Sequence, residues 1–287
     1  MKLRRLIIFF AIAPAVLGGD PALGADSPPR TEWGDPDLRG LWSNATVTPL
    51  ERPAGLGDKT HLTEEEAGEE RSKGLENILN LAKTIPEGEL TGELNEVWLE
   101  PPTEVVDSRR TSLIVDPLDG KIPFTKEGRQ RQMRGLGRRF GGATAESHED
   151  LHLGDRCLLF GILHFPNPFY LNNHQIFQTP DYVAIVSEYG PQTRIIPLDG
   201  RSALDEKVTQ WNGSSLGRWE GDTLVVETRN YSGRGFFQGA TAELSIVERF
   251  KRVDESTIDY ALTVTDAASS ITAGPAIRWP LLRSWRR

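Results

Sequence analysis

The chain has 287 residues, 38% of them hydrophobic and 26% charged, which is an ordinary balance for one large or two small globular domains. Its 28 glycines and 19 prolines favour many turns over long helices. A net charge of −8 makes nucleic acid and anionic membrane surfaces poor partners.

Residues 1–25 have the pattern of a signal peptide. Lys2, Arg4 and Arg5 form a basic start. An apolar run from Leu6 to Leu17 follows, and small residues up to Ala25 offer a cleavage site. The run is shorter than the roughly 20 apolar residues of a membrane-spanning helix. We therefore expect a periplasmic or secreted protein that has no membrane contact after cleavage.

Residues 26–110 are expected to form an extended arm and a helix that pack on the body of the protein. The stretch before residue 60 is rich in Pro, Gly, Asp and Trp and has little periodicity. Its apolar anchors would be Trp33, Leu38, Leu41 and Trp42. This pattern predicts a covering segment rather than a separate domain.

A helix is predicted to begin at Thr63. The segment Thr63–Glu66 is a capping box, in which the Thr hydroxyl and the Glu carboxylate satisfy free amides of the first turn. Pro86 would end the helix. Its apolar face would carry Leu75, Ile78, Leu79, Ala82 and Ile85. A weaker helical pattern covers Lys126–Arg134.

Residues 111–287 are expected to form an antiparallel β domain, because the apolar period changes to two and turn sequences recur every 8–12 residues. The predicted strands are 112–115, 121–124, 175–179, 183–188, 193–198, 223–228, 244–252 and 257–265. One apolar face per strand suits an up-and-down, lipocalin-like barrel or a strongly curved sheet. Small barrels of this kind can enclose one small ligand.

Three charged residues are candidates for chemistry inside the sheet. Glu248 shares its phase with the apolar residues of its strand, so the alternation points it inward. Glu188 ends the run that contains Val186, and Arg194 shares a face with Ile196. A buried carboxylate needs a partner, and burial can raise its pKa for acid or base work. The alternative is a structural ion pair.

A second candidate group is dense in amide and imidazole side chains. Asn173, His174 and Gln175 are consecutive, and Gln178 follows. They could bind a hydroxylated or carbonyl-containing small molecule. The alternative is that they satisfy backbone groups of a turn.

Neither a metal nor a cofactor is predicted. His148 and His152 match a short zinc-protease pattern, but their flanks lack the apolar helical face that such a motif needs. The segment 213–217 matches a serine nucleophile elbow, yet it leads into a strand rather than a helix. The single cysteine, Cys157, is interpreted as a packing residue.

The segment Trp211–Thr228 resembles the signature of a large family of exported, uncharacterised bacterial proteins. The pattern reads W-x-G-x-S-x-G-x-W-E-G-D-T-L-V-V-E-T. The resemblance extends to segments 37–42, 112–117, 156–157, 175–180 and 247–250. It implies export but no activity. Such proteins usually continue past the strand near Trp279 to a second cysteine, so the resemblance implies that a C-terminal segment is missing here and leaves open whether Cys157 has a disulfide partner.

Two functions follow from these patterns. The first is an exported small-molecule enzyme of isomerase, lyase or hydrolase type, in which Glu188, Arg194 and Glu248 transfer protons. The second is a periplasmic binding or carrier protein that uses the same interior without turnover. Two inward carboxylates in unequal surroundings would favour the enzyme.

Overall fold

The computed structural model describes residues 28–83, 102, 104–140, 147, 166, 171–189, 192–233, 240–266 and 276–284. Strands dominate this part of the chain: β1 Gly40–Ser43, β2 Ile114–Asp116, β3 Asn173–Gln178, β4 Tyr182–Ser187, β5 Gln192–Pro197, β6 Ser214–Glu220, β7 Thr223–Arg229, β8 Ser245–Arg252, β9 Thr257–Thr265 and β10 Ala276–Arg283. The helices are α1 Glu64–Lys83, α2 Lys126–Phe140 and the short 3-10 helix η1 Ala54–Leu56.

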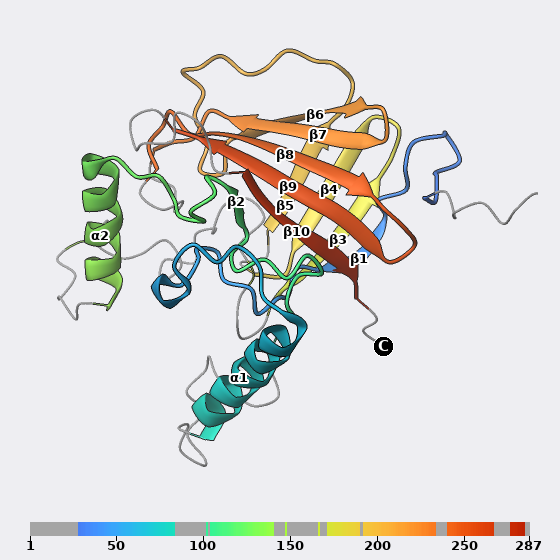
Figure 1. Cartoon of the computed structure of the whole chain (residues 1–287). Coiled ribbons are helices and arrows are strands. Elements are labelled where there is room, and N and C mark those ends of the chain that lie inside the picture. The colour runs from blue at the N-terminus through green and yellow to red at the C-terminus, as the bar shows by residue number, and fades with distance from the viewer. Residues whose placement is uncertain are drawn as a thin grey trace, which may run out of the picture.

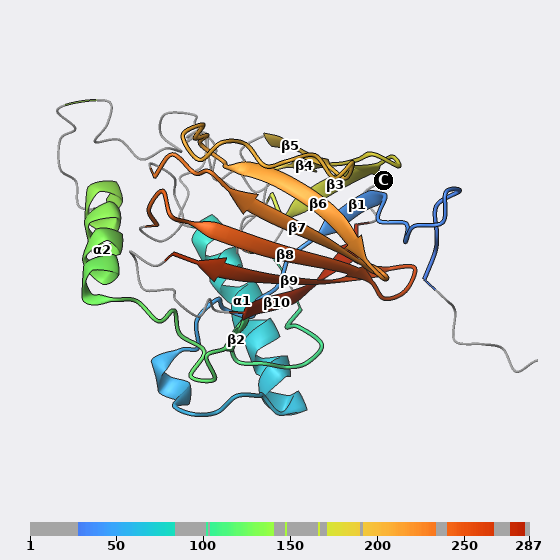
Figure 2. The same cartoon turned by 90° about the horizontal axis from the view of Figure 1, so that it is seen from above.

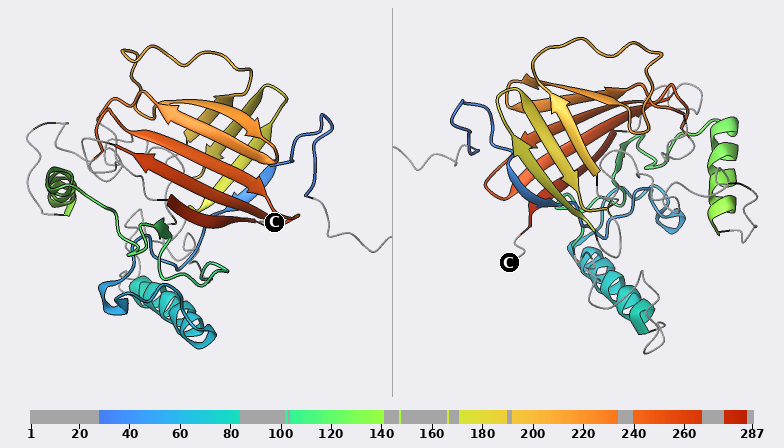
Figure 3. Two further views of the ribbon diagram at one scale, coloured as in Figure 1. Left: turned by 45° about the horizontal axis from the view of Figure 1, so that its top comes forward. Right: turned by 180° about the vertical axis from the view of Figure 1, so that it is seen from behind.

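The strands form a nearly closed antiparallel barrel, which confirms the predicted fold class (Figure 1). Their order is β5-β4-β3-β1-β10-β9-β8-β7-β6, and β2 pairs with β10 outside this path. The two end strands, β5 and β6, lie side by side without a shared ladder of hydrogen bonds. In Figure 3 the yellow strands β3–β5 form one wall and the orange-to-red strands β7–β10 form the wall opposite.

Gly217 allows the barrel to close between β5 and β6. A Cβ at this position would lie 2.8 Å from Cγ2 of Ile196 and 2.6 Å from Cδ2 of Leu198. The two β5 side chains therefore occupy the space that any larger residue on β6 would need. Close packing of Ile196 and Leu198 against Gly217, rather than a ladder of hydrogen bonds, joins β5 to β6 at this seam.

One face of the strands points into the barrel interior. On β9 the buried side chains are Ile258, Tyr260, Leu262 and Val264, as the period of two predicts. The ring of Tyr260 lies 4.8 Å from that of Phe250 and 4.8 Å from that of Trp279. These aromatic contacts join β8, β9 and β10 into one continuous core.

The N-terminal arm packs into the barrel core and also enters its wall. Leu38 is fully buried in the core. Gln178 accepts a hydrogen bond from the Leu38 amide at 2.9 Å and donates one to the Pro36 carbonyl at 3.1 Å. Residues 40–43 were expected to lie over the body. They instead form β1 between β3 and β10, where Trp42 is fully buried.

Helix α1 begins as predicted. The Thr63 amide donates to Oε2 of Glu66 at 2.8 Å, and the Glu66 amide donates to Oγ1 of Thr63 at 3.2 Å. The helix spans Glu64–Lys83, and Pro86 lies outside the described residues. Leu75, expected on its buried face, is 40% exposed, whereas Ala67 is fully buried against Leu62 and Val105. The side chains of Ile78, Leu79, Ala82 and Ile85 lie outside the described residues.

Helix α2 is longer than the predicted 126–134 and runs to Phe140. Oγ1 of Thr125 accepts a hydrogen bond from the Gly128 amide at 3.0 Å, which caps its first turn. Figure 2 shows both helices outside the barrel wall. Within the described ranges, no helix combines the length and the apolar character needed to cross a membrane.

The predicted strand 121–124 is absent. The Ile122 amide donates to Oε1 of Glu51 at 2.7 Å instead of to a neighbouring strand. The Phe124 amide donates to the Ile122 carbonyl at 2.9 Å, which makes a tight local turn. This segment is therefore held by a side chain from the arm, and the apolar residues that suggested a strand pack on the core as a loop.

Candidate functional site

A polar cluster lies inside the barrel at Glu248 of β8. Its carboxylate accepts two hydrogen bonds from Arg194 of β5, at 2.6 Å from Nη1 and 3.0 Å from Nη2. The Tyr260 hydroxyl of β9 donates to Oε1 of Glu248 at 2.7 Å. The Glu248 side chain is 0% exposed and that of Arg194 is 10% exposed. The predicted inward direction of Glu248 and Arg194 is confirmed, and the two form one buried, bidentate pair.

The protonation states of this cluster follow from its surroundings. Burial and then the charge of Glu248 raise the pKa of Tyr260 well above its ordinary value. The pKa of Tyr231 is raised by the same two causes in the same order. Burial alone would lower the pKa of Arg194, but the charge and hydrogen bonds of Glu248 outweigh it and raise the pKa. Arg194 is thus a cation at neutral pH, and both phenols are neutral.

Tyr231 is the part of this cluster that has an unused polar group. The residue is 3% exposed, and the charges of Glu248 and Arg194 both act on it. Its hydroxyl lies beside Thr228 but has no hydrogen-bonding partner of good geometry among the described residues. The Thr228 hydroxyl shares a hydrogen bond with that of Ser215 at 2.9 Å. A buried hydroxyl without a partner is costly and calls for an explanation.

The backbone at the start of β6 brings this region together. Gly213 has φ +67°, and a Cβ there would lie 2.6 Å from the Arg229 carbonyl oxygen and 3.0 Å from Cζ of Tyr231. Only glycine permits both that conformation and that approach. Gln210 forms a bridge with Tyr231, so the loop before β6 lies directly against the Tyr231 segment.

Contrary to the prediction, Glu188 does not join the cluster of Arg194 and Glu248. Its carboxylate accepts hydrogen bonds from Asn173, at 2.7 Å from Nδ2 and 3.3 Å from the amide. On β4 the buried side chains are Val183 and Ile185, so the inward face is the one opposite to the face predicted. Glu188 therefore belongs to the outer phase, and the interior holds one of the two predicted carboxylates.

The predicted amide and imidazole group divides between the two faces of β3. His174 and Gln178 are buried on the inner face, with Nδ1 of His174 3.1 Å from the Ser187 hydroxyl. Asn173 and Gln175 belong to the outer phase, where Asn173 bonds Glu188. Both the side-chain oxygen and the side-chain nitrogen of Gln178 form hydrogen bonds with the backbone of the arm. These contacts favour the alternative that Gln178 satisfies backbone groups rather than a ligand.

Tyr231 and Tyr260 are not among the site residues predicted from the sequence. Tyr260 shares its phase with Ile258 and Leu262, so the alternation that identified Glu248 also places this hydroxyl inside. Tyr231 follows β7 after Asn230, which has φ +61°. No strand period reaches Tyr231, so only the folded chain brings it to the cluster.

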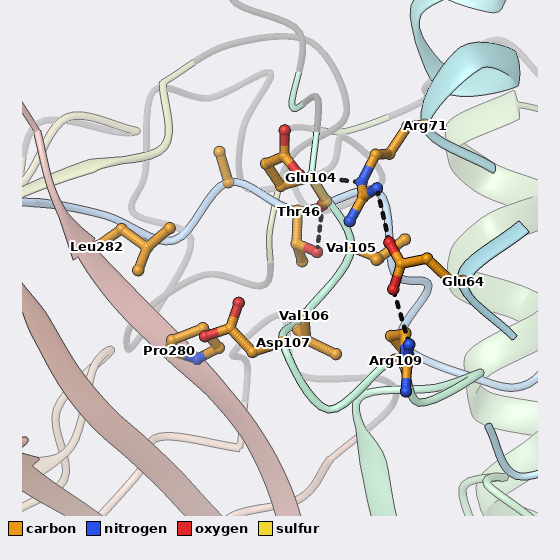
Figure 4. A pocket seen from close by; sticks show the side chains of 11 residues that line it. Thr46, Glu64, Arg71, Glu104, Val105, Val106, Asp107, Arg109, Pro280 and Leu282 are labelled. Atoms are coloured by element: carbon orange, nitrogen blue, oxygen red, sulfur yellow. Dashed lines mark hydrogen bonds and ion pairs between the residues drawn. The ribbon is translucent and has the colours of Figure 1, made fainter. Parts of the chain in front are cut away.

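A second site lies outside the barrel, between α1, the segment 104–109 and β10. It is a pocket of about 220 Å³ with Val105, Val106, Pro280 and Leu282 among its lining residues. Figure 4 shows a chain of charges along it. Arg109 Nη1 lies 2.7 Å from Glu64, Arg71 Nη1 lies 3.6 Å from Glu64, and Arg71 Nε lies 3.0 Å from Glu104. These partly exposed pairs join α1 to the segment 104–109.

The remaining sequence candidates cannot be placed. His148, His152 and Cys157 lie outside the described residues. Within the residues that are described, no three His, Cys, Asp or Glu side chains gather in a way that could hold a metal ion. The elbow pattern at 213–217 falls on the start of strand β6, which is a β-hairpin strand and not the strand-to-helix turn of a hydrolase.

Comparison with known proteins leaves the site as the basis for assigning a function. No family model, curated protein or solved structure matches this chain.

Proposed function

We propose that this chain is an exported small-molecule binding protein that holds its ligand at the Tyr231 side of the barrel interior. The proposal rests on the buried Tyr231 hydroxyl, which lies near the Arg194–Glu248 pair. This hydroxyl has no hydrogen-bonding partner of good geometry among the described residues. Protein interiors rarely leave such a group unsatisfied unless a water or a ligand meets it.

Binding without turnover fits this interior better than proton transfer. Acid–base catalysis by two carboxylates needs both inside, in unequal surroundings. Here Glu188 bonds Asn173, and Glu248 already accepts hydrogen bonds from Arg194 and Tyr260. Tyr260 has a raised pKa, which makes it a poor proton donor to substrate. The cluster therefore has fixed donors but no free base.

The charges of the cluster define the class of ligand. Arg194 and Glu248 neutralise each other, and both phenols are uncharged. A charged ligand would add an uncompensated charge to a largely apolar interior, which is strongly disfavoured. A neutral molecule with a carbonyl or hydroxyl group can meet the Tyr231 hydroxyl without that cost. The expected ligand is thus small, largely apolar and uncharged.

The substitution Tyr231→Phe tests the proposal. If the hydroxyl has no partner within the protein, its removal should leave the free energy of unfolding unchanged or raise it by about 1 kcal/mol in the absence of ligand. A neutral ketone or alcohol that raises the melting temperature of the parent protein should lose that effect in the variant. The probes are cyclohexanone and cyclohexanol, compared with cyclohexane.

A matched control is Tyr182→Phe. Tyr182 lies on the outer face of β4, and its hydroxyl accepts a hydrogen bond from Arg201 at 2.6 Å, so this change should leave ketone binding intact. If Tyr231→Phe lowered stability by about 1 kcal/mol or more, the hydroxyl would already have an internal partner and the proposal would fail. Equal ketone binding by the variant and the parent would have the same consequence.

A further inference from the structure

Arg52 is a buried cation whose partners are all neutral. The residue is 2% exposed. Nε donates to the Thr111 hydroxyl at 2.9 Å, Nη2 to the Leu118 carbonyl at 2.7 Å and Nη1 to the Gly57 carbonyl at 3.4 Å. In the described part of the chain no carboxylate forms an ion pair with this guanidinium. Its hydrogen bonds hold it in place, but its charge is not balanced.

Arg110 has an unused binding edge. Its Nε and Nη2 atoms are enclosed, and neither has a hydrogen-bonding partner among the described residues. Elsewhere in the molecule the same edge holds a carboxylate: Arg39 donates from Nε and Nη2 to Asp37 at 2.9 and 3.0 Å, and Arg278 does the same with Asp259. This edge is a planar fork that matches two oxygens of one anion.

The two arginines belong to one positively charged region. Arg52 contacts Thr111, the residue that follows Arg110. Burial lowers the pKa of Arg110, and the charge of the nearby Arg52 lowers it further. His61 lies directly opposite Arg110 in an antiparallel bridge, so its side chain leaves the bridge on the same side.

We propose that the Nε–Nη2 edge of Arg110, backed by Arg52, binds a small divalent oxyanion of the phosphate or sulfate type. Arg52 is buried and Arg110 is half-buried, and neither is paired with a carboxylate among the described residues, so a doubly charged anion would compensate both. A tetrahedral oxyanion offers the pair of oxygens that the fork requires. This site is distinct from the barrel interior and carries the opposite preference, for a charged ligand.

Thermal unfolding in the presence of simple anions tests this site. Sodium phosphate and sodium sulfate should raise the melting temperature by about 2–4 °C above sodium chloride of equal ionic strength. Sodium acetate, whose anion carries one charge, should give a smaller shift. Isothermal titration with phosphate should show one site per chain. Phosphate and chloride with equal effects would overturn the proposal, as would acetate matching phosphate.

Variants at Arg110 separate specific binding from a general salt effect. Arg110→Met removes a half-buried charge that has no ion pair among the described residues, so it should keep or raise the melting temperature in chloride and lose the phosphate shift. Arg110→Lys keeps the charge but not the fork and should retain only part of that shift. The control is the neighbouring Arg109→Met, since Arg109 already pairs with Glu64 at 2.7 Å; this variant should keep the whole shift.

Two further outcomes decide the matter. A strongly destabilised Arg110→Met protein that still responds to phosphate would show that Arg110 has an internal partner and that the anion binds elsewhere, which contradicts the proposal. The Tyr231→Phe variant should respond to phosphate as the parent does, because the anion site does not include the barrel interior. Loss of the phosphate response in that variant would contradict the assignment to Arg110.

Discussion

Glu248 shows how one residue can organise the interior of a barrel. Its carboxylate is fully buried, yet Arg194 and Tyr260 direct three hydrogen bonds to it. Removing two charges from water is expensive, and only close, well-aligned contacts offset that cost. The arrangement links β5, β8 and β9 across the barrel, and it also sets the electrostatic surroundings of Tyr231.

The substitution Glu248→Gln should be strongly destabilising. It leaves the Arg194 guanidinium buried without a counter-charge, so the free energy of unfolding should fall by about 3–5 kcal/mol. Chemical denaturation of the variant measures this. The double variant Arg194→Met, Glu248→Gln should recover much of the loss, because no unpaired charge remains. Normal stability of the single variant would contradict a structural ion pair and would revive the acid–base interpretation.

Individual residues of the site differ in how far the sequence could predict them. Glu248 and Arg194 were recognised because apolar residues two positions away define one clear inner face. On β4 the residues from Tyr182 to Val186 are apolar in both phases, so alternation cannot decide which face is inside. The pairing with β3 and β5 decides it, and Glu188 was placed on the wrong side for that reason.

At the scale of elements, the strands with polar outer faces were predicted well and the glycine-rich strand was not. β7, β8 and β9 match their predicted ranges within one or two residues. β6 contains Gly217 and follows Gly213, a composition that is typical of loops. It becomes a strand because β7 pairs with it along its whole length and because Ile196 of β5 and the nearby Leu198 pack against Gly217.

The seam between β5 and β6 should depend on Gly217. In Gly217→Val the new side chain would collide with Ile196 and Leu198, and such overpacking costs about 1–3 kcal/mol of stability. Urea denaturation measures the loss. The control is Gly55→Val, because a Cβ at Gly55 has no neighbour within 4 Å. Equal stability of the two variants would show that the barrel does not rely on close packing at this seam.

At the scale of the whole molecule, the arm and the barrel are one folding unit. Leu38 is buried in the barrel core, and β1 lies between β3 and β10. Sequence patterns could not predict this, since the segment from 26 to 60 has no period and its strand is short. The anchoring roles of Leu38 and Trp42 were predicted from their apolar character, and their burial confirms them.

The export prediction also belongs to this scale. The basic start and the apolar run Leu6–Leu17 should direct secretion, after which the mature chain should begin between residues 23 and 26. N-terminal sequencing of the protein from the periplasmic or secreted fraction checks this. An intact Met1 on soluble protein from the cytoplasm would contradict it.

The central claim is that the barrel holds a neutral small molecule at Tyr231, and native mass spectrometry tests it most directly. The protein would be purified under non-denaturing conditions from the cells that produce it naturally. The expected result is a population of the mature chain that carries one small organic molecule, which is lost on denaturation and is absent or strongly reduced in Tyr231→Phe. A bare chain only, or a bound molecule held equally by parent and variant, would contradict the claim.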